Sequence, residues 1–149
     1  MERKHSYLVT GPPYEAGSEA ELFRDLARTW ANGSRQMAAL AAADAAAYRH
    51  VLQPNQYVPD SKPISAEERA TAYVEESRNA VAVRRGYPEL EAAGRQLSSQ
   101  GIAFRDLTGI FADSRETLYT DSCCHLNAEG YRRVVAALCP DLRAALSGP

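Results

Sequence analysis

Apolar residues recur with helical spacing in the first third of the chain. Ser18 and Glu21 have the spacing of a capping box, which predicts the start of a helix. The apolar face behind it comprises Leu22, Phe23, Leu26, Ala27 and Trp30. Asn32-Gly33 is expected to end this helix and Ser34 to cap a second one. The apolar positions of that second helix are Met37, Leu40, Ala41 and Ala45.

The middle of the chain alternates between strand and helix patterns. Ala47–Gln53 is a predicted strand, and the polar, proline-containing segment 55–63 after it reads as a loop. A second capping box, Ser65 with Glu68, predicts a helix that runs to about Arg85. The pattern therefore changes from strand to helix within about a dozen residues.

The remaining elements complete this alternation. Gly86 is expected to close the preceding helix, and Pro88 to open the next one, which Gly101 would end. Ile102–Leu107 is a second predicted strand. Asn127 can cap a last helix, which we expect to end before Pro140, with an apolar face of Tyr131, Val134, Val135 and Leu138. Ser6–Thr10 reads as a further short strand.

Strands separated by helices are typical of a parallel sheet covered by helical layers. We therefore expect a single domain spanning residues 1–149, of the three-layer α/β/α sandwich class with a flavodoxin-like parallel sheet. Few strands are visible, so the sheet is expected to be incomplete, with N-terminal strands missing. Uncovered helix faces and an open sheet edge would follow, satisfied by a missing N-terminal half or by a homodimer.

Two polar clusters fall where parallel sheets place their ligands, beyond the carboxyl ends of strands. Gln53, Asn55 and Gln56 follow the first long strand. Their amides either bind hydroxyl or carbonyl groups of a substrate or satisfy the backbone of the proline-rich loop. Asp121 and His125 lie in the loop before the last helix.

An Asp and a His on one loop suit general acid–base chemistry. The His takes a proton from a hydroxyl nucleophile and returns it to the leaving group, while the Asp fixes the tautomer and stabilises the imidazolium. The alternative is that Asp121 only caps a turn and His125 is a packed or solvent-facing residue.

Composition narrows the class of function. The 149 residues carry a net charge of −2 and no basic stripe, which argues against nucleic-acid binding. No apolar run is long enough for a membrane span, and the charged start lacks the apolar core of a signal peptide, so a cytoplasmic location is expected.

Three segments together resemble a known superfamily. The string DSCCHLNAEGY at 121–131 resembles the final sequence block of the SGNH/GDSL serine hydrolases. LQPNQYVPDSKPIS at 52–65 and FRDLTGIF at 104–111 resemble one bacterial subgroup and its penultimate strand. This likeness covers residues 30–137. It implies hydrolysis of a carboxylic ester of a small molecule or acyl group, with His125 as general base and acid and Asp121 as its orienter. No metal or cofactor is implied.

The sequence departs from the superfamily pattern in two respects. Three residues separate Asp121 from His125, where the usual spacing is two. The Gly-Asp-Ser block that supplies the nucleophile and the Gly-x-Asn-Asp block that supplies oxyanion donors are both absent. Without a nucleophile, a triad loses most of its rate enhancement. The isolated chain is therefore expected to be inactive.

Other chemistry is less favoured by the pattern. Cys123 and Cys124 neighbour His125, so a thiolate–His pair is an alternative, but free cysteines are commonly packed. Four candidate ligands within five residues cannot close a tetrahedral metal site. Three interpretations remain for the whole chain: a truncated hydrolase, one half of a split hydrolase, or a non-catalytic remnant that serves as a binding or interaction module.

Overall fold

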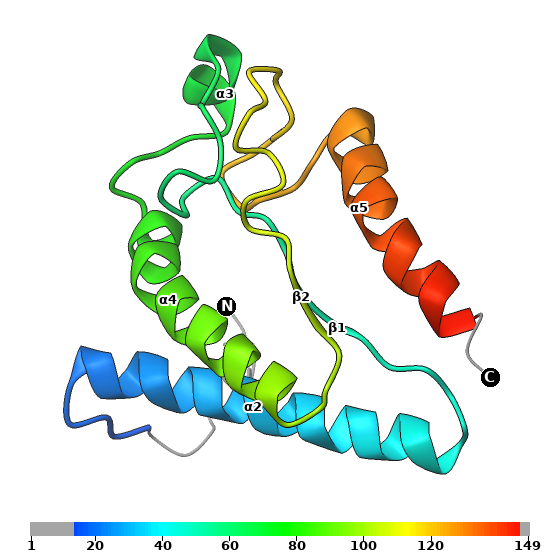
Figure 1. The fold of residues 1–149 in the computed structure, drawn as a ribbon. Coiled ribbons are helices and arrows are strands. Elements are labelled where there is room, and N and C mark those ends of the chain that lie inside the picture. Colours follow the sequence, from blue (N-terminus) through cyan, green and yellow to red (C-terminus); the bar gives the residue numbers. More distant parts are fainter. Residues whose placement is uncertain (1–13, 147–149) are drawn as a thin grey trace, which may run out of the picture.

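The computed structural model describes residues 14–146, and the predicted strand at 6–10 lies outside this range. The elements are α2 (Glu19–Ala43), β1 (His50–Leu52), α3 (Ala66–Thr71), α4 (Arg78–Ser99), β2 (Phe104–Asp106) and α5 (Ala128–Leu146). The two strands pair in parallel, with His50 opposite Phe104 and Leu52 opposite Asp106. Figure 1 shows α4 on one side of the strands and α5 on the other. The chain therefore has a mixed α/β fold, with helices connecting parallel strands.

The first two predicted helices are one. Ser18 caps α2 as expected, because its hydroxyl accepts a hydrogen bond from the Glu21 N–H at 3.2 Å. The helix then continues through Asn32-Gly33, where the sequence predicted a break. A helical glycine costs about 1 kcal/mol. Burial of Ala31 and Ser34 on either side offsets it, and the Ser34 hydroxyl lies 3.2 Å from that of Tyr48.

The single helix predicted from Ser65 to about Arg85 is wrong, because two separate helices occupy this part of the chain. Its capping box forms, but α3 ends at Thr71 and α4 begins only at Arg78. Between α3 and α4, tertiary contacts hold the chain in a non-helical conformation. Gln56 Nε2 donates to the Ala72 carbonyl at 3.0 Å, and the Tyr57 hydroxyl accepts from the Val74 N–H at 3.1 Å.

Two prolines that were expected to mark helix boundaries lie inside helices. Pro88 falls within α4 and Pro140 within α5. A proline in a helix interior costs about 3 kcal/mol, because it removes a donor and crowds the preceding turn. In α4, burial of Tyr87 and Leu97 on either side of Pro88 offsets that cost.

Both strands are confirmed as shorter segments of the predicted ones. Gly94 allows α4 to approach β2 closely, since a Cβ there would lie 2.2 Å from the Phe104 ring. Gly101 follows the C-cap of α4 with a φ of +82°, as its predicted C′ role requires. These glycines bring the helix directly onto the sheet.

The densest packing lies at the carboxyl end of the strands. The buried cluster comprises Ala72, Phe111, Leu118, Tyr119 and Leu126. Val134 of α5 packs against this cluster, and Asp141 of the same helix pairs with Arg49 at 3.6 Å. The core therefore sits beneath the loop that carries Asp121 and His125.

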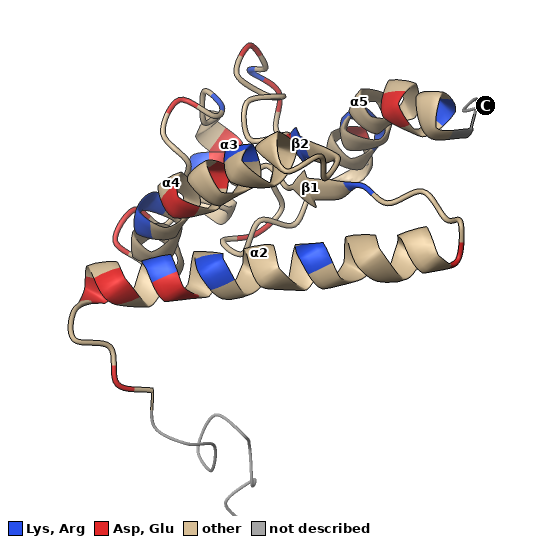
Figure 2. Ribbon diagram, turned by 60° about the horizontal axis from the view of Figure 1, so that its bottom comes forward, with Lys and Arg blue, Asp and Glu red and all other residues tan. Residues whose placement is uncertain are grey.

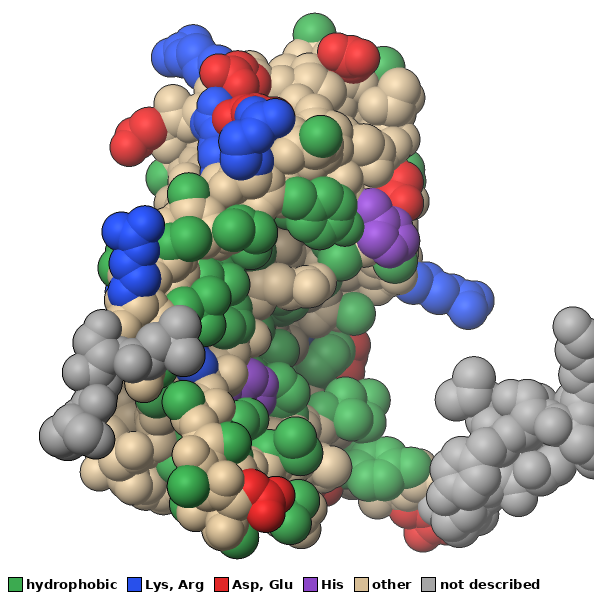
Figure 3. Space-filling view, turned by 90° about the vertical axis from the view of Figure 1, so that its right-hand side faces the viewer, with side chains coloured by type: hydrophobic (Ala, Val, Ile, Leu, Met, Phe, Trp, Pro, Cys, Tyr) green, Lys and Arg blue, Asp and Glu red, His purple; other side chains and the backbone are tan. Residues whose placement is uncertain are grey.

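The outer helices leave large apolar side chains uncovered. On α2, the exposed ones are Leu26, Met37 and Leu40; on α5, they are Tyr131, Val135 and Leu142. Charged residues of both signs lie along the first part of α2, and none lies between Arg35 and Asp44 (Figure 2). Figure 3 shows hydrophobic side chains spread over the side of the molecule that carries α5 and lining a hollow there. Among the described residues, no helix is long and apolar enough to cross a membrane.

Candidate functional site

The loop before α5 is closed by backbone hydrogen bonds. Tyr119 and Leu126 form an antiparallel bridge, and the Thr120 N–H donates to the His125 carbonyl at 2.9 Å. Asn127 then caps the helix, accepting the Gly130 N–H at 2.9 Å. Residues 120–125 therefore form a short loop whose two ends are fixed to the core.

Asp121 is the organising residue of this loop. One carboxylate oxygen, Oδ1, accepts the Cys123 N–H at 2.8 Å and the His125 N–H at 3.3 Å. The other, Oδ2, lies 2.5 Å from His125 Nδ1. The hydrogen bond to the His125 side chain, followed by that from the Cys123 backbone, holds the pKa of Asp121 below its ordinary value. The extra residue in the Asp-to-His spacing thus leaves the two side chains in contact.

The same contact sets the state of the imidazole. Because a carboxylate can only accept, His125 carries a proton on Nδ1, and its Nε2 is the nitrogen available as a base. The side chain of His125 is 63% exposed and that of Asp121 46% exposed, so the pair is open to reactants. This is the arrangement that a general base and its orienting carboxylate require.

His125 lines a pocket of about 200 Å³. The other lining residues are Gln53, Pro54, Cys124, Leu126, Tyr131 and Val134. The pocket is mostly apolar, with the Gln53 amide as a polar group opposite the loop; Gln53 Nε2 donates to Cys124 Sγ at 3.2 Å. Apolar side chains thus surround the Gln53 amide beside His125.

The three predicted amides have different environments. Only Gln53 is exposed and lines the pocket. Asn55 is buried, and its side-chain oxygen accepts the Tyr57 N–H at 3.0 Å. Gln56 is also buried, and its Nε2 donates to the Asp121 carbonyl at 2.9 Å. Asn55 and Gln56 therefore bind the backbone of the loops, and Gln56 holds the residue that orients His125.

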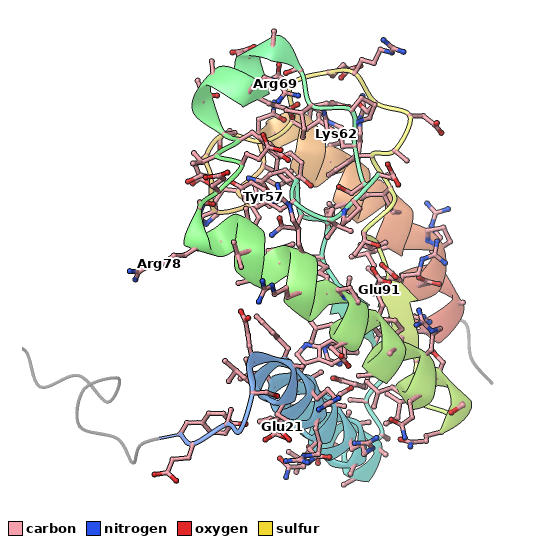
Figure 4. The ribbon with its side chains drawn as sticks, turned by 90° about the vertical axis from the view of Figure 1, so that its left-hand side faces the viewer. Glu21, Tyr57, Lys62, Arg69, Arg78 and Glu91 are labelled. Carbon is pink, nitrogen blue, oxygen red and sulfur yellow. The ribbon has the colours of Figure 1, made fainter. Side chains whose placement is uncertain are left out.

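A buried ion pair fixes the chain just before this loop. Lys62 Nζ lies 2.7 Å from Glu68 Oε2, and both side chains are almost completely buried. Glu68 Oε1 accepts the N–H groups of Leu118 and Tyr119 at 2.8 and 3.0 Å. Burial alone would raise the pKa of Glu68, but hydrogen bonds from Lys62 and three backbone N–H groups lower it. Figure 4 shows Lys62 and Tyr57 within the loops below α3.

One hydroxyl group, the phenol of Tyr131, lines the His125 pocket. Among the described residues, no serine or threonine lines this pocket. Cys124 does, but burial raises the pKa of its thiol, so the thiolate form is disfavoured. Its backbone is in the left-handed region, with a φ of +77°. The thiol-enzyme alternative is therefore the less favoured one.

Sequence reasoning missed two contributors to the site. Lys62 carried no pattern that could have revealed its buried partner, although the capping box identified Glu68 as an N3 residue. Tyr87 directly precedes Pro88, which was expected to open a helix, and its hydroxyl donates to the Gln53 carbonyl at 3.4 Å. Tyr87 and Gln53 are 34 residues apart, and Lys62 lies outside the helix that contains Glu68, so neither contact follows from a helical or strand spacing.

We compared the chain with protein-family models, with curated protein sequences and with solved structures, and none of them matches it significantly.

Proposed function

We propose that this chain supplies the general-base half of an ester hydrolase of the SGNH/GDSL type. In this proposal His125 is the general base and acid, and Asp121 orients it. The nucleophile comes from a polypeptide segment outside the described residues. The strands β1 and β2 are then part of a wider flavodoxin-like parallel sheet, in a three-layer α/β/α sandwich.

One observation carries the proposal: the contact between His125 Nδ1 and Asp121 Oδ2, 2.5 Å apart, at the edge of a pocket. It leaves His125 Nε2 available to accept a proton from an attacking hydroxyl. Asp121 stays ionised, since its hydrogen bonds lower its pKa. It therefore stabilises the imidazolium as the proton arrives, and the same proton is then returned to the leaving alkoxide.

The pocket supports an ester as the substrate class. Its apolar side chains, Leu126, Tyr131 and Val134, suit the hydrocarbon part of a small or acyl ester. The Gln53 amide, which lies against Cys124 Sγ, is a hydrogen-bond donor that can turn to a substrate carbonyl. A thiol is a weak acceptor, so exchanging it for a carbonyl oxygen is favourable.

The experiment joins the chain to its missing nucleophile. The polypeptide encoded immediately upstream is co-expressed with the chain and treated with a fluorophosphonate, which labels serines activated by a neighbouring base. We expect labelling of one serine with the wild-type chain. His125→Ala should abolish the labelling, whereas Ser122→Ala, a change in the same loop outside the pair, should retain it.

Two results would count against this function. Equal labelling with wild type and His125→Ala would show that His125 is not the base. If neither the wild-type chain nor any variant gives labelling, the result would favour a binding or interaction module without catalysis.

A further inference from the structure

Among residues 14–146, one edge of β1, here called its free edge, has no partner strand. The His50 N–H donates to the Ala103 carbonyl at 2.8 Å, and the Leu52 carbonyl accepts from the Leu107 N–H at 3.0 Å. Adjacent residues of a strand direct their backbone groups to opposite edges, so those of Val51 point away from β2. Within residues 14–146 the sheet has two strands only, so no described strand pairs with that edge.

An apolar groove of about 350 Å³ lies between α2 and α4. Its lining includes Phe23, Leu26 and Trp30 from α2 and Val83, Tyr87 and Leu90 from α4. No charged residue lines it, and Leu26 is 54% exposed although it faces a groove of apolar neighbours. Apolar surface of this kind gains about 25 cal/mol per Å² when it is covered.

The free edge and the groove adjoin each other. The Trp30 ring, which lines the groove, lies 4.1 Å from the ring of His50 in β1 and 6.0 Å from that of Phe104 in β2. The helix α2 is thus on the β1 side of the sheet, and its apolar residues extend toward the free edge. At the other end, Tyr87 lines the groove and binds the carbonyl of Gln53, which lines the His125 pocket.

We propose that the edge of β1 and the α2–α4 groove form one docking surface for an extended polypeptide segment. The segment continues the parallel β1–β2 ladder, binds the backbone of Val51, and places alternate apolar side chains in the groove. This inference rests on the proposed function in one respect. A strand parallel to β1 ends beside the His125 pocket, so the residues after it are placed to present the nucleophile.

The backbone groups of Val51, which pair with no described residue, distinguish an added strand from other occupants of this surface. A hydrocarbon ligand or an amphipathic helix could fill the groove, but neither can pair with the N–H and C=O of Val51, whereas an added strand satisfies both. The groove then gives specificity through the side chains that face it, as in other cases of strand addition.

The test uses peptides selected on the purified 149-residue chain from a random phage-displayed library and then synthesised. Binding is followed through the fluorescence of Trp30, the single tryptophan of the chain. We expect selected sequences with apolar residues at alternate positions, and protection of the Val51 amide from hydrogen exchange when the peptide binds.

Matched variants separate the edge from the groove. Val51→Pro removes the outward N–H but is tolerated at a strand edge, so we expect a folded protein whose affinity for the peptide is at least about tenfold lower. Val51→Ala, which keeps the N–H, should bind within about threefold of wild type. Leu26→Asp should weaken binding, whereas Leu40→Asp should not, since Leu40 is exposed on the same helix but does not line the groove.

Four results would overturn the docking surface: no selected peptide, apolar residues at helical spacing, unchanged binding to Val51→Pro, or a free chain that is already a dimer with Val51 protected. The last result would assign the surface to a second copy. None of these readouts involves His125, so the docking surface and the proposed hydrolase can fail independently.

Discussion

Two regions of this molecule are held together in different ways. The loops at the carboxyl end of the strands, residues 53–72 and 117–127, are joined by buried polar contacts centred on Glu68 and Gln56. The helices α2 and α5 make few such contacts and expose large apolar side chains, among them Leu40 at 63% and Val135 at 58%. The first region is held by directional polar contacts, although Gln56 Oε1 and the Tyr119 hydroxyl are buried without a partner among the described residues. The second has apolar surface that no described residue covers.

The difference shows that some parts of a fold need only a few contacts between neighbouring segments, whereas others need a broad partner surface. Directional contacts from Glu68 of α3, and from Lys62 and Gln56 of the loop before it, position the chain around the Asp121–His125 loop. Burial of an apolar helix face needs an extended partner surface, and a two-stranded sheet is too narrow to provide it. The candidate site is therefore organised even where the layer around it is not closed.

The largest effect is expected at the buried ion pair. Glu68→Ala leaves Lys62 buried without its partner and removes the acceptor of three backbone N–H groups, those of Ser65, Leu118 and Tyr119, so the free energy of unfolding should fall by about 3–5 kcal/mol. The exposed neighbour Glu67→Ala should cost less than about 1 kcal/mol. Urea unfolding measures both. If Glu68→Ala does not fold, the double variant Lys62→Met/Glu68→Leu should, because it removes both charges.

Two leucines compare the packed and uncovered surfaces directly. Leu97 of α4 is completely buried, so Leu97→Ala should lower the free energy of unfolding by about 2–5 kcal/mol. Leu40→Ala should change it by no more than about 0.5 kcal/mol, since its side chain is already exposed. Equal losses in urea unfolding would mean that α2 is covered in solution, for example by a second copy.

Acid should weaken the clamped loops selectively. The pKa of Glu68 is lower in the folded chain than its ordinary value of 4.5. Ionised Glu68 therefore contributes its full stability above that ordinary value, and the contribution is lost as the pH falls through the lowered one. The difference in unfolding free energy between wild type and Glu68→Gln should shrink between pH 7 and this acid range. A constant difference would show that the charge of Glu68 is not what stabilises the loops.

The smallest effect is expected in catalysis by the isolated chain. Because no serine or threonine of the described residues lines the His125 pocket, hydrolysis of p-nitrophenyl acetate should not exceed that by free imidazole at the same concentration. Saturable activity well above that level, lost in His125→Ala, would reveal a nucleophile within the chain. Loss in Cys124→Ser would identify it as the thiol.

Local signals in the sequence predicted the fold better where one motif determined one element. Short patterns predicted the Ser18 N-cap, the Ser65–Glu68 capping box, the C′ role of Gly101, the Asn127 cap and the two strands. The helix end expected at Gly33 and the helix start expected at Pro88 are wrong. Burial on both sides of these residues outweighs a local cost of a few kcal/mol. The Asp121–His125 contact was accessible from sequence, since both residues share one loop. The hydrogen bonds from the Leu118 and Tyr119 N–H groups to Glu68 join segments about fifty residues apart, which no local pattern encodes.

The state of the His125 ring tests the central claim most directly. Nitrogen-15 NMR of the imidazole side chains distinguishes which ring nitrogen carries the proton. We predict that neutral His125 is protonated on Nδ1 in the wild type, with that proton strongly shifted downfield by Asp121. Asp121→Asn should remove the shifted proton and alter the tautomer, while Ser122→Ala should leave both unchanged. A wild-type His125 protonated on Nε2 and indifferent to Asp121→Asn would contradict the assignment of a general-base pair.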